Sequence, residues 1–212
     1  MIFKYFLLES LYETIDYEGN HKIAQKNATL PVEKGGLGLH PKNTAMERAK
    51  AMGFTIPAYH FSRHGVDTDT LDSSKFAISP FDAVGTHFGD AQTAHDRFTR
   101  TVGNYDTPRP SNTYPVLIKD KPYLNKHNKE WDEDDLNFHL RDLGGYNDNK
   151  TPYNRDSALK LREKVFKNAD HIPYVNDVEG KGKVSYIAPP KSVRSIFAAF
   201  DPMKKDSENM LD

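Results

Sequence analysis

Three side chains in this sequence could do chemistry if the fold brought them together. Glu179 lies on a glycine-rich turn between two strand-like runs, and His60 and His87 each lie in a short predicted strand. A carboxylate beside a sheet can stabilise a developing positive charge, and a histidine can bond a hydroxyl or move a proton near neutral pH. Taken singly, each has a simpler interpretation, as a solvated loop glutamate or as an ordinary strand histidine.

The composition argues against several functional classes. The chain has no cysteine, which excludes disulfides, thiolate nucleophiles and cysteine-ligated zinc. Its net charge of -1 provides no overall field that attracts nucleic acid. Four lysines between residues 119 and 129 are interpreted as a solvated loop, with a nucleic-acid contact as the alternative. No run reaches the roughly 18 apolar residues of a membrane span, so we expect no membrane contact.

Histidine spacing does not predict a metal site. His60 and His64 are four residues apart, which would suit a zinc pair only on one face of a helix. Pro57 and Gly65 argue against a helix through this segment. We therefore expect no bound metal.

Hydrophobic periodicity and capping residues predict both helices and strands. Predicted helices cover residues 43–52, with Asn43 or Thr44 as the cap, and residues 91–100, 131–143 and 157–166. Predicted strands cover residues 54–61, 84–89, 114–118, 172–175, 184–187 and 193–196. Short strands separated by long loops and grouped helices favour an α+β fold over a doubly wound parallel sheet. After Pro202 we expect a frayed polar tail.

Several short motifs resemble those of one enzyme family. The motifs are Ala58-Tyr-His60, Gly85-Thr-His-Phe-Gly89, Asn176-Asp-Val-Glu179, Ser185-Tyr-Ile187, Val193-Arg-Ser195 and Phe200-Asp-Pro202. In this order they resemble ADP-ribosyltransferase domains of the His–aromatic–Glu branch, in particular those of phage and prophage polyvalent and head-morphogenesis proteins. The resemblance predicts an α+β fold with a split antiparallel β-sheet and flanking helices over residues 41–202. Residues 1–40 would be an N-terminal extension, and residues 203–212 a polar tail.

The resemblance implies a NAD-dependent mono-ADP-ribosyltransferase that modifies a macromolecule, with NAD hydrolysis as an accompanying activity. Glu179 would be the catalytic carboxylate that stabilises an oxocarbenium-like ribose. The side chains that contact NAD would be His60, Phe61, Ser62, His87 and Phe88. The implied setting is a phage effector or toxin in the bacterial host cytoplasm or associated with the virion, with protein preferred to nucleic acid as the acceptor.

Three positions depart from the family pattern. Phe61 stands where glycine is common, His87 stands at the family's tyrosine position, and Ser185 stands where many relatives carry the catalytic glutamate. Two hypotheses follow. Either the turn brings Glu179 into the site, or the domain is a catalytically degenerate transferase fold that acts as a virion or interaction module. Because Val178 precedes Glu179, the Glu-x-Glu pattern of arginine-specific transferases is absent.

Overall fold

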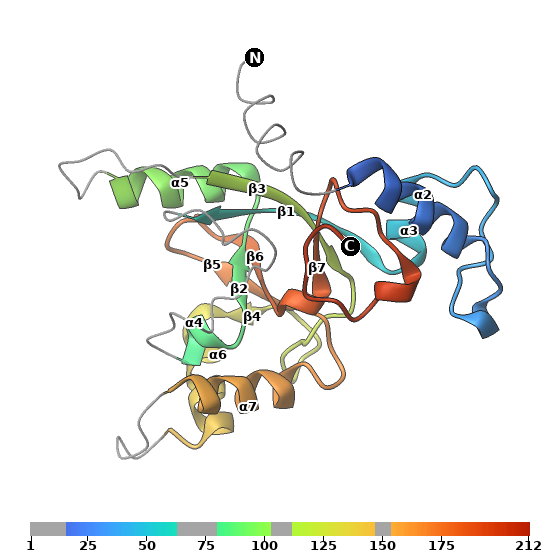
Figure 1. Cartoon of the computed structure of the whole chain (residues 1–212). Coiled ribbons are helices and arrows are strands. Elements are labelled where there is room, and N and C mark those ends of the chain that lie inside the picture. The colour runs from blue at the N-terminus through green and yellow to red at the C-terminus, as the bar shows by residue number, and fades with distance from the viewer. Residues whose placement is uncertain (1–15, 63–79, 103–111, 147–153) are drawn as a thin grey trace.

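A computed structural model describes residues 16–62, 80–102, 112–146 and 154–212 of the chain (Figure 1). The helices are α2 (Tyr17–Ala28), α3 (Ala45–Ala51), α4 (Pro80–Ala83), α5 (Ala91–Val102), α6 (Glu133–Gly144) and α7 (Arg155–Val165), with short 3-10 turns η1 (Val32–Lys34), η3 (Pro190–Ser192) and η4 (Pro202–Lys204). The strands are β1 (Phe54–Ser62), β2 (Thr86–Phe88), β3 (Asn112–Lys119), β4 (Trp131–Asp132), β5 (Ile172–Asn176), β6 (Lys183–Ala188) and β7 (Val193–Ser195). The predicted α+β class is confirmed.

The strands form two sheets that an isolated backbone bridge connects. One sheet has the order β1-β3-β7 and is antiparallel, and the other has the order β2-β6-β5-β4, with only the β4–β5 pair parallel. An isolated bridge joins them, because the Tyr59 and Gly89 backbones exchange hydrogen bonds of 2.8 and 3.0 Å. We call this junction the sheet seam. It places the end of β1 beside the start of the segment that leads into α5.

Capping residues explain where several helices begin and end. Thr44 and Glu47 form a reciprocal capping box at the start of α3, and Gly53, just past the end of that helix, has a φ of 85°. Asn154 forms the same kind of box with Ser157 at the start of α7. These local signals were readable in the sequence, and the helices they predicted are confirmed with small shifts of their ends.

The core has three parts that follow the two sheets. The largest packs α6 and α7 against β5 and β6 through residues such as Leu136, Leu161 and Ile187. A second lies between the sheets and includes Phe88 and Val116. A third packs α3 and the first residue of β1 against the C-terminal segment. Side chains of β6 pack alternately into the first and the second part of the core, because successive side chains of a strand point to opposite faces.

Two sequence expectations about the ends of elements are wrong. Trp131 lies in β4 and not in the helix that follows, because Asp132 caps α6 through its carboxylate. The segment after Pro202 is not frayed: Ser195 N–H donates to the Met210 carbonyl at 2.8 Å, and Met210 is buried. The reason is that β7 would otherwise leave edge backbone groups without partners.

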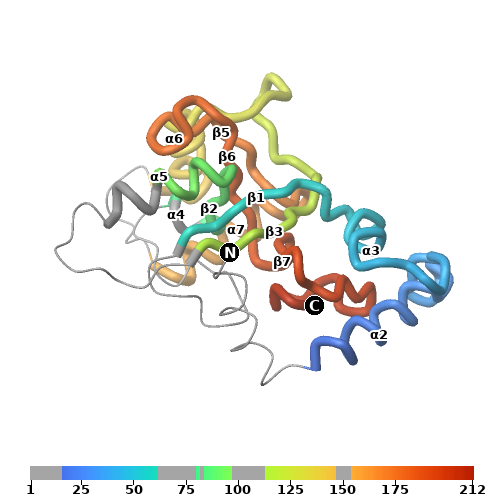
Figure 2. Tube along the Cα trace, turned by 90° about the horizontal axis from the view of Figure 1, so that it is seen from above, coloured from blue at the N-terminus to red at the C-terminus, as the bar shows by residue number. Residues whose placement is uncertain are grey.

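Helix α2 lies beside the C-terminal segment, which Figures 1 and 2 show from two directions. Ala24 and Ala28 of this helix are fully buried, and Asn27 Nδ2 donates to the Asp201 carboxylate at 3.0 and 3.1 Å. Gln25 Nε2 donates to the Asn43 carbonyl at 2.8 Å. Residues 17–28 of the predicted N-terminal extension are thus packed onto the rest of the structure; residues 1–15 lie outside the described residues.

Candidate functional site

His60 lies at the sheet seam and is held by the neighbouring sheet. Its Nδ1 lies 2.9 Å from the His87 carbonyl oxygen, and its ring lies 5.6 Å from that of Phe88 and 6.5 Å from that of Tyr114. Because a carbonyl oxygen only accepts, Nδ1 carries the proton, and Nε2 is the acceptor of the neutral ring. The contact therefore sets both the tautomer and the direction of the imidazole.

His87 and Phe88 point to opposite faces of β2, as neighbours in a strand must. Phe88 is 2% exposed and packs between the two sheets, on the face that it shares with the His60 ring. The His87 ring packs on the other face against Phe81 and Tyr174, with ring centroids 4.8 and 5.8 Å away. The structure thus brings Phe88 together with His60 but puts His87 in a different environment.

Both ring nitrogens of His87 are used in this environment. Nε2 lies 3.2 Å from the Phe81 carbonyl oxygen and must donate to it. In the neutral ring Nδ1 is then the acceptor, and it takes a hydrogen bond from the Tyr174 hydroxyl at 3.1 Å. These two hydrogen bonds therefore fix the His87 ring against the largest part of the core, on the face of β2 opposite Phe88.

Phe61 and Ser62 complete β1 beyond His60. Phe61 pairs with Thr113 and Ser62 with Asn112 in the antiparallel ladder with β3. Phe61 is half-buried and, by strand alternation, points to the face opposite His60. The side chain of Ser62 lies outside the described residues.

Glu179 lies on the hairpin turn between β5 and β6, and a single side chain organises that turn. The Asn176 Oδ1 accepts three backbone hydrogen bonds, from Val178, Glu179 and Gly180, at 3.1, 2.9 and 3.1 Å. Gly182 continues the turn with a φ of 82°, which favours glycine. The half-buried Glu179 is therefore carried on a well-bonded turn.

Glu133 is a second carboxyl group beside this turn, and the sequence reading missed it. Burial raises its pKa, a backbone hydrogen bond from Asp177 lowers it, and the charge of Glu179 raises it again. Its Oε2 is buried and has no hydrogen-bond partner in the described part of the chain. The only signal in the sequence was an acidic run at a helix start, which ordinary capping already explains. A carboxyl group whose pKa is raised by burial and by a neighbouring carboxylate is a pattern found at acid–base sites.

Ser185, at the position that the resemblance pairs with a glutamate of the ADP-ribosyltransferase family, is buried. It is 1% exposed, and its Oγ accepts from Asn176 Nδ2 at 3.2 Å. A Cβ placed on Gly89 would lie 2.7 Å from Thr93 Cγ2 and 3.5 Å from this Oγ. Gly89 and the buried Ser185 thus lie side by side across β2 and β6.

Two lysines tie the Glu179 turn to α5. Lys183 Nζ lies 2.6 Å from the Asp90 carboxylate and Lys181 Nζ lies 3.4 Å from that of Asp96. The hydrogen bond from Lys183 lowers the pKa of Asp90 to about 2, against a smaller opposing effect of burial. Helix α5 also packs on β1, so it contacts both the strand that carries His60 and the turn that carries Glu179.

Comparisons of the chain with protein-family models, with curated proteins and with solved structures find no match. Within the ranges that the structure describes, no group of three or more His, Asp or Glu side chains is arranged to hold a metal ion. No helix among those residues is long and apolar enough to cross a membrane. The functional interpretation therefore depends on the geometry of the site and on the motifs of the sequence.

Proposed function

We propose that this chain is a NAD-dependent mono-ADP-ribosyltransferase built on a split-sheet fold, with hydrolysis of NAD when water is the acceptor. The observation that carries the proposal is a continuous path of contacts from His60 to Glu179. Tyr59 bridges to Gly89, Gly89 adjoins Ser185, and Ser185 bonds the Asn176 side chain that organises the Glu179 turn. The path crosses β1, β2, β6 and β5, or about three interstrand spacings of ~4.8 Å. A dinucleotide can bridge such a separation.

The described residues would take the following roles in the reaction. The bond between the ribose C1′ and the nicotinamide nitrogen breaks, neutral nicotinamide leaves with the bonding electrons, and the ribose becomes cationic. The Glu179 carboxylate stabilises that cation, and the acceptor then bonds to C1′ and releases its proton to solvent. His60 binds a ribose hydroxyl of the adenosine half, with its imidazole held by the His87 carbonyl and packed beside the Phe88 ring.

The environment of the Glu133 carboxyl group disfavours its ionisation, because burial, the largest effect, and the charge of Glu179 both raise its pKa. We therefore propose Glu179, and not Glu133, as the carboxylate that stabilises the cation. Because the net charge of -1 gives no attraction to nucleic acid, we propose a protein acceptor, in a bacterial host cytoplasm or on a phage particle.

The test is nicotinamide release from NAD labelled in its adenylate part, with transfer of label to lysate proteins. We expect Glu179→Gln to lower release by about 10²- to 10³-fold, because the electrostatic stabilisation of the cation is lost. Glu163→Gln, which changes an exposed glutamate of α7, is the matched control and keeps the parent rate. Equal rates for the parent and Glu179→Gln, or no NAD binding by calorimetry, would contradict the proposal.

A second candidate function is a transferase fold that acts as a virion or interaction module without catalysis. Ser185 favours it, because the position of the family's glutamate holds a buried, hydrogen-bonded hydroxyl. This candidate predicts that the parent chain releases no nicotinamide. Nuclease treatment of labelled lysate separates a third outcome, in which the label sits on nucleic acid.

A further inference from the structure

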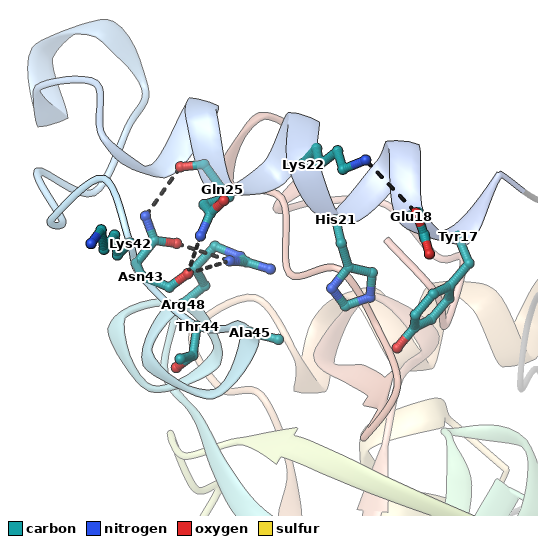
Figure 3. Close-up of a pocket in the computed structure, with 10 residues that line it drawn as sticks. All are labelled: Tyr17, Glu18, His21, Lys22, Gln25, Lys42, Asn43, Thr44, Ala45 and Arg48. Atoms are coloured by element: carbon teal, nitrogen blue, oxygen red, sulfur yellow. Dashed lines mark hydrogen bonds and ion pairs between the residues drawn. The ribbon is translucent and has the colours of Figure 1, made fainter.

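A cavity of about 470 Å³ that is broadly open to solvent lies between α2 and the start of α3, at the end of β1 remote from His60 (Figure 3). Helix α3 packs on β1, which begins at Phe54. His60 lies six residues further along the strand, or roughly 20 Å at about 3.3 Å per residue. The cavity is thus separate from the candidate transferase site, and its volume falls in the range of small-molecule pockets.

Arg48 is the decisive side chain of this cavity. It is 2% exposed, and among the described residues its guanidinium donates to three neutral oxygens: the Ala199 carbonyl at 2.9 Å, the Asn43 Oδ1 at 2.8 Å and the Asn43 carbonyl at 3.3 Å. Its Nη2 donates to no group in the described part of the chain. In Figure 3 the guanidinium extends beneath α2 toward His21. A buried guanidinium that lacks an ion-pair partner gains stability from an anion that can reach it.

The two carboxylates that act on Arg48 within the described ranges do so without a direct ion pair. Asp201 and Glu47 favour its charged form, Asp201 more strongly, while burial lowers its pKa. Neither carboxylate comes within 4.0 Å of the guanidinium in the described part of the chain. The Asp201 oxygens take the Asn27 amide, and Glu47 Oε2 takes both the N–H and the hydroxyl of Thr44. The bonds between Thr44 and Glu47 also form the cap of α3, so we do not propose the N-terminus of this short helix as a binding site by itself.

The other lining residues make the cavity cationic. Lys22, Lys42 and Arg48 against Glu18 give the lining a formal charge of +2 with His21 neutral. The His21 Nε2 lies 3.2 Å from the Phe197 carbonyl oxygen and donates to it, and its ring packs on Tyr17 at 4.3 Å. Burial lowers the pKa of His21, a smaller effect of the Phe197 carbonyl opposes this, and the charge of Arg48 lowers the pKa further.

We propose that this cavity binds the phosphate group of a small phosphorylated molecule, with Arg48 Nη2 as the central donor and Lys42 at the rim, while Lys22 pairs with Glu18 at 3.7 Å on the surface of α2. A phosphate dianion matches the charge of the lining, and its several oxygens suit a guanidinium together with ammonium groups. The Tyr17–His21 ring pair beside it suits the organic part of such a ligand.

The test is calorimetric titration of the full chain at low ionic strength with inorganic phosphate, pyrophosphate and, as a carboxylate probe, acetate. We expect pyrophosphate to bind more tightly than phosphate, and acetate to bind at least tenfold more weakly. Arg48→Lys keeps the charge but loses the forked donors, so it should weaken phosphate binding about tenfold or more. Lys42→Gln should weaken it about threefold, whereas the control Lys160→Gln on α7 should not change it.

Several outcomes would overturn the proposal. They are a folded parent chain that gives no binding signal with either phosphate probe, equal binding of acetate and phosphate, or loss of affinity in the Lys160→Gln control. If Arg48→Lys fails to fold, parent-like binding by folded Lys42→Gln overturns the rim assignment instead. None of these results depends on nicotinamide release, so this proposal and the transferase proposal fail separately.

Discussion

The two ends of β1 are built in different ways. At its first residue, Phe54 is 1% exposed and packs edge-on against Phe200 at 5.5 Å, with Lys119 and Arg194 over its ring at 5.1 and 5.4 Å. At its other end, His60 is half-buried and is oriented by one hydrogen bond to the backbone of β2. One end is organised by burial of aromatic and cationic groups, and the other by hydrogen bonds at the sheet seam.

The difference shows that the residues whose types suggest chemistry need not be the residues that line the cavity. Residues that could do chemistry by type, such as His60 and Glu179, lie at or near the seam and on hydrogen-bonded turns. The cationic cavity lies at the opposite end, under Arg48, which a helix pattern would assign to a solvated face. Each end of β1 therefore supports its own functional proposal. Substitutions at the two ends should change the free energy of unfolding by different amounts.

The largest expected effect is at the packed end. Phe54→Ala should lower the free energy of unfolding by about 3–5 kcal/mol, because it leaves a cavity among Phe200, Lys119 and Arg194. Phe61→Ala, at the half-buried end of the same strand, should cost only about 1–2 kcal/mol. Urea unfolding of both variants measures the contrast. Equal losses would mean that the two ends are packed alike.

An intermediate effect is expected at the Glu179 turn. Asn176→Ala removes the acceptor of three backbone N–H groups and the donor to Ser185, and should cost about 2–3 kcal/mol. Hydrogen exchange of the Val178 and Gly180 amides should become faster. Asn176→Asp keeps the acceptor oxygen and is the matched control, so its amides should stay protected. Unchanged exchange in Asn176→Ala would show that the turn does not depend on this side chain.

The smallest effect concerns Asp90 and Lys183. The pKa of Asp90 is lowered from 3.8 to about 2, so its contribution to stability is present above pH ~4 and is lost as the pH falls toward 2. Because the Asp90 side chain is 46% exposed, solvent screening reduces this contribution to about 0.5 kcal/mol or less. Asp90→Asn keeps the helix cap through Thr93 and should lack this pH dependence. Parallel acid-unfolding curves for the parent and the variant would contradict the assignment.

Much of the fold could be read from local patterns. Thr44, Glu47 and Gly53 mark the ends of α3, and alternating apolar residues predicted the strands that carry His60 and Ile187. These signals act within a few residues, so no partner from elsewhere in the chain is needed to interpret them. Trp131 was assigned wrongly because its apolar spacing fits a helix, whereas its pairing with Tyr174 is a long-range contact.

The candidate site was predictable only in part. His60 and Phe88 come together at the seam, but the role of His87 depends on which face of β2 turns toward Tyr174. A strand pattern in the sequence shows that His87 and Phe88 face opposite ways and does not show which face meets which core. Glu133 was missed because its pKa is set by burial and by Glu179, a neighbour in space and not in sequence.

The sequence by itself determined the α+β class, most helix and strand positions, the caps and the absence of cysteine, because each follows from composition or from short-range periodicity. Only the tertiary structure decided that α2 packs on the C-terminal segment through Asn27 and Asp201. It also decided that Arg48 is buried under α2 with no carboxylate within ion-pair distance in the described part of the chain. These contacts join residues up to 174 positions apart, and burial and charge pairing over such separations arise only when the chain is folded.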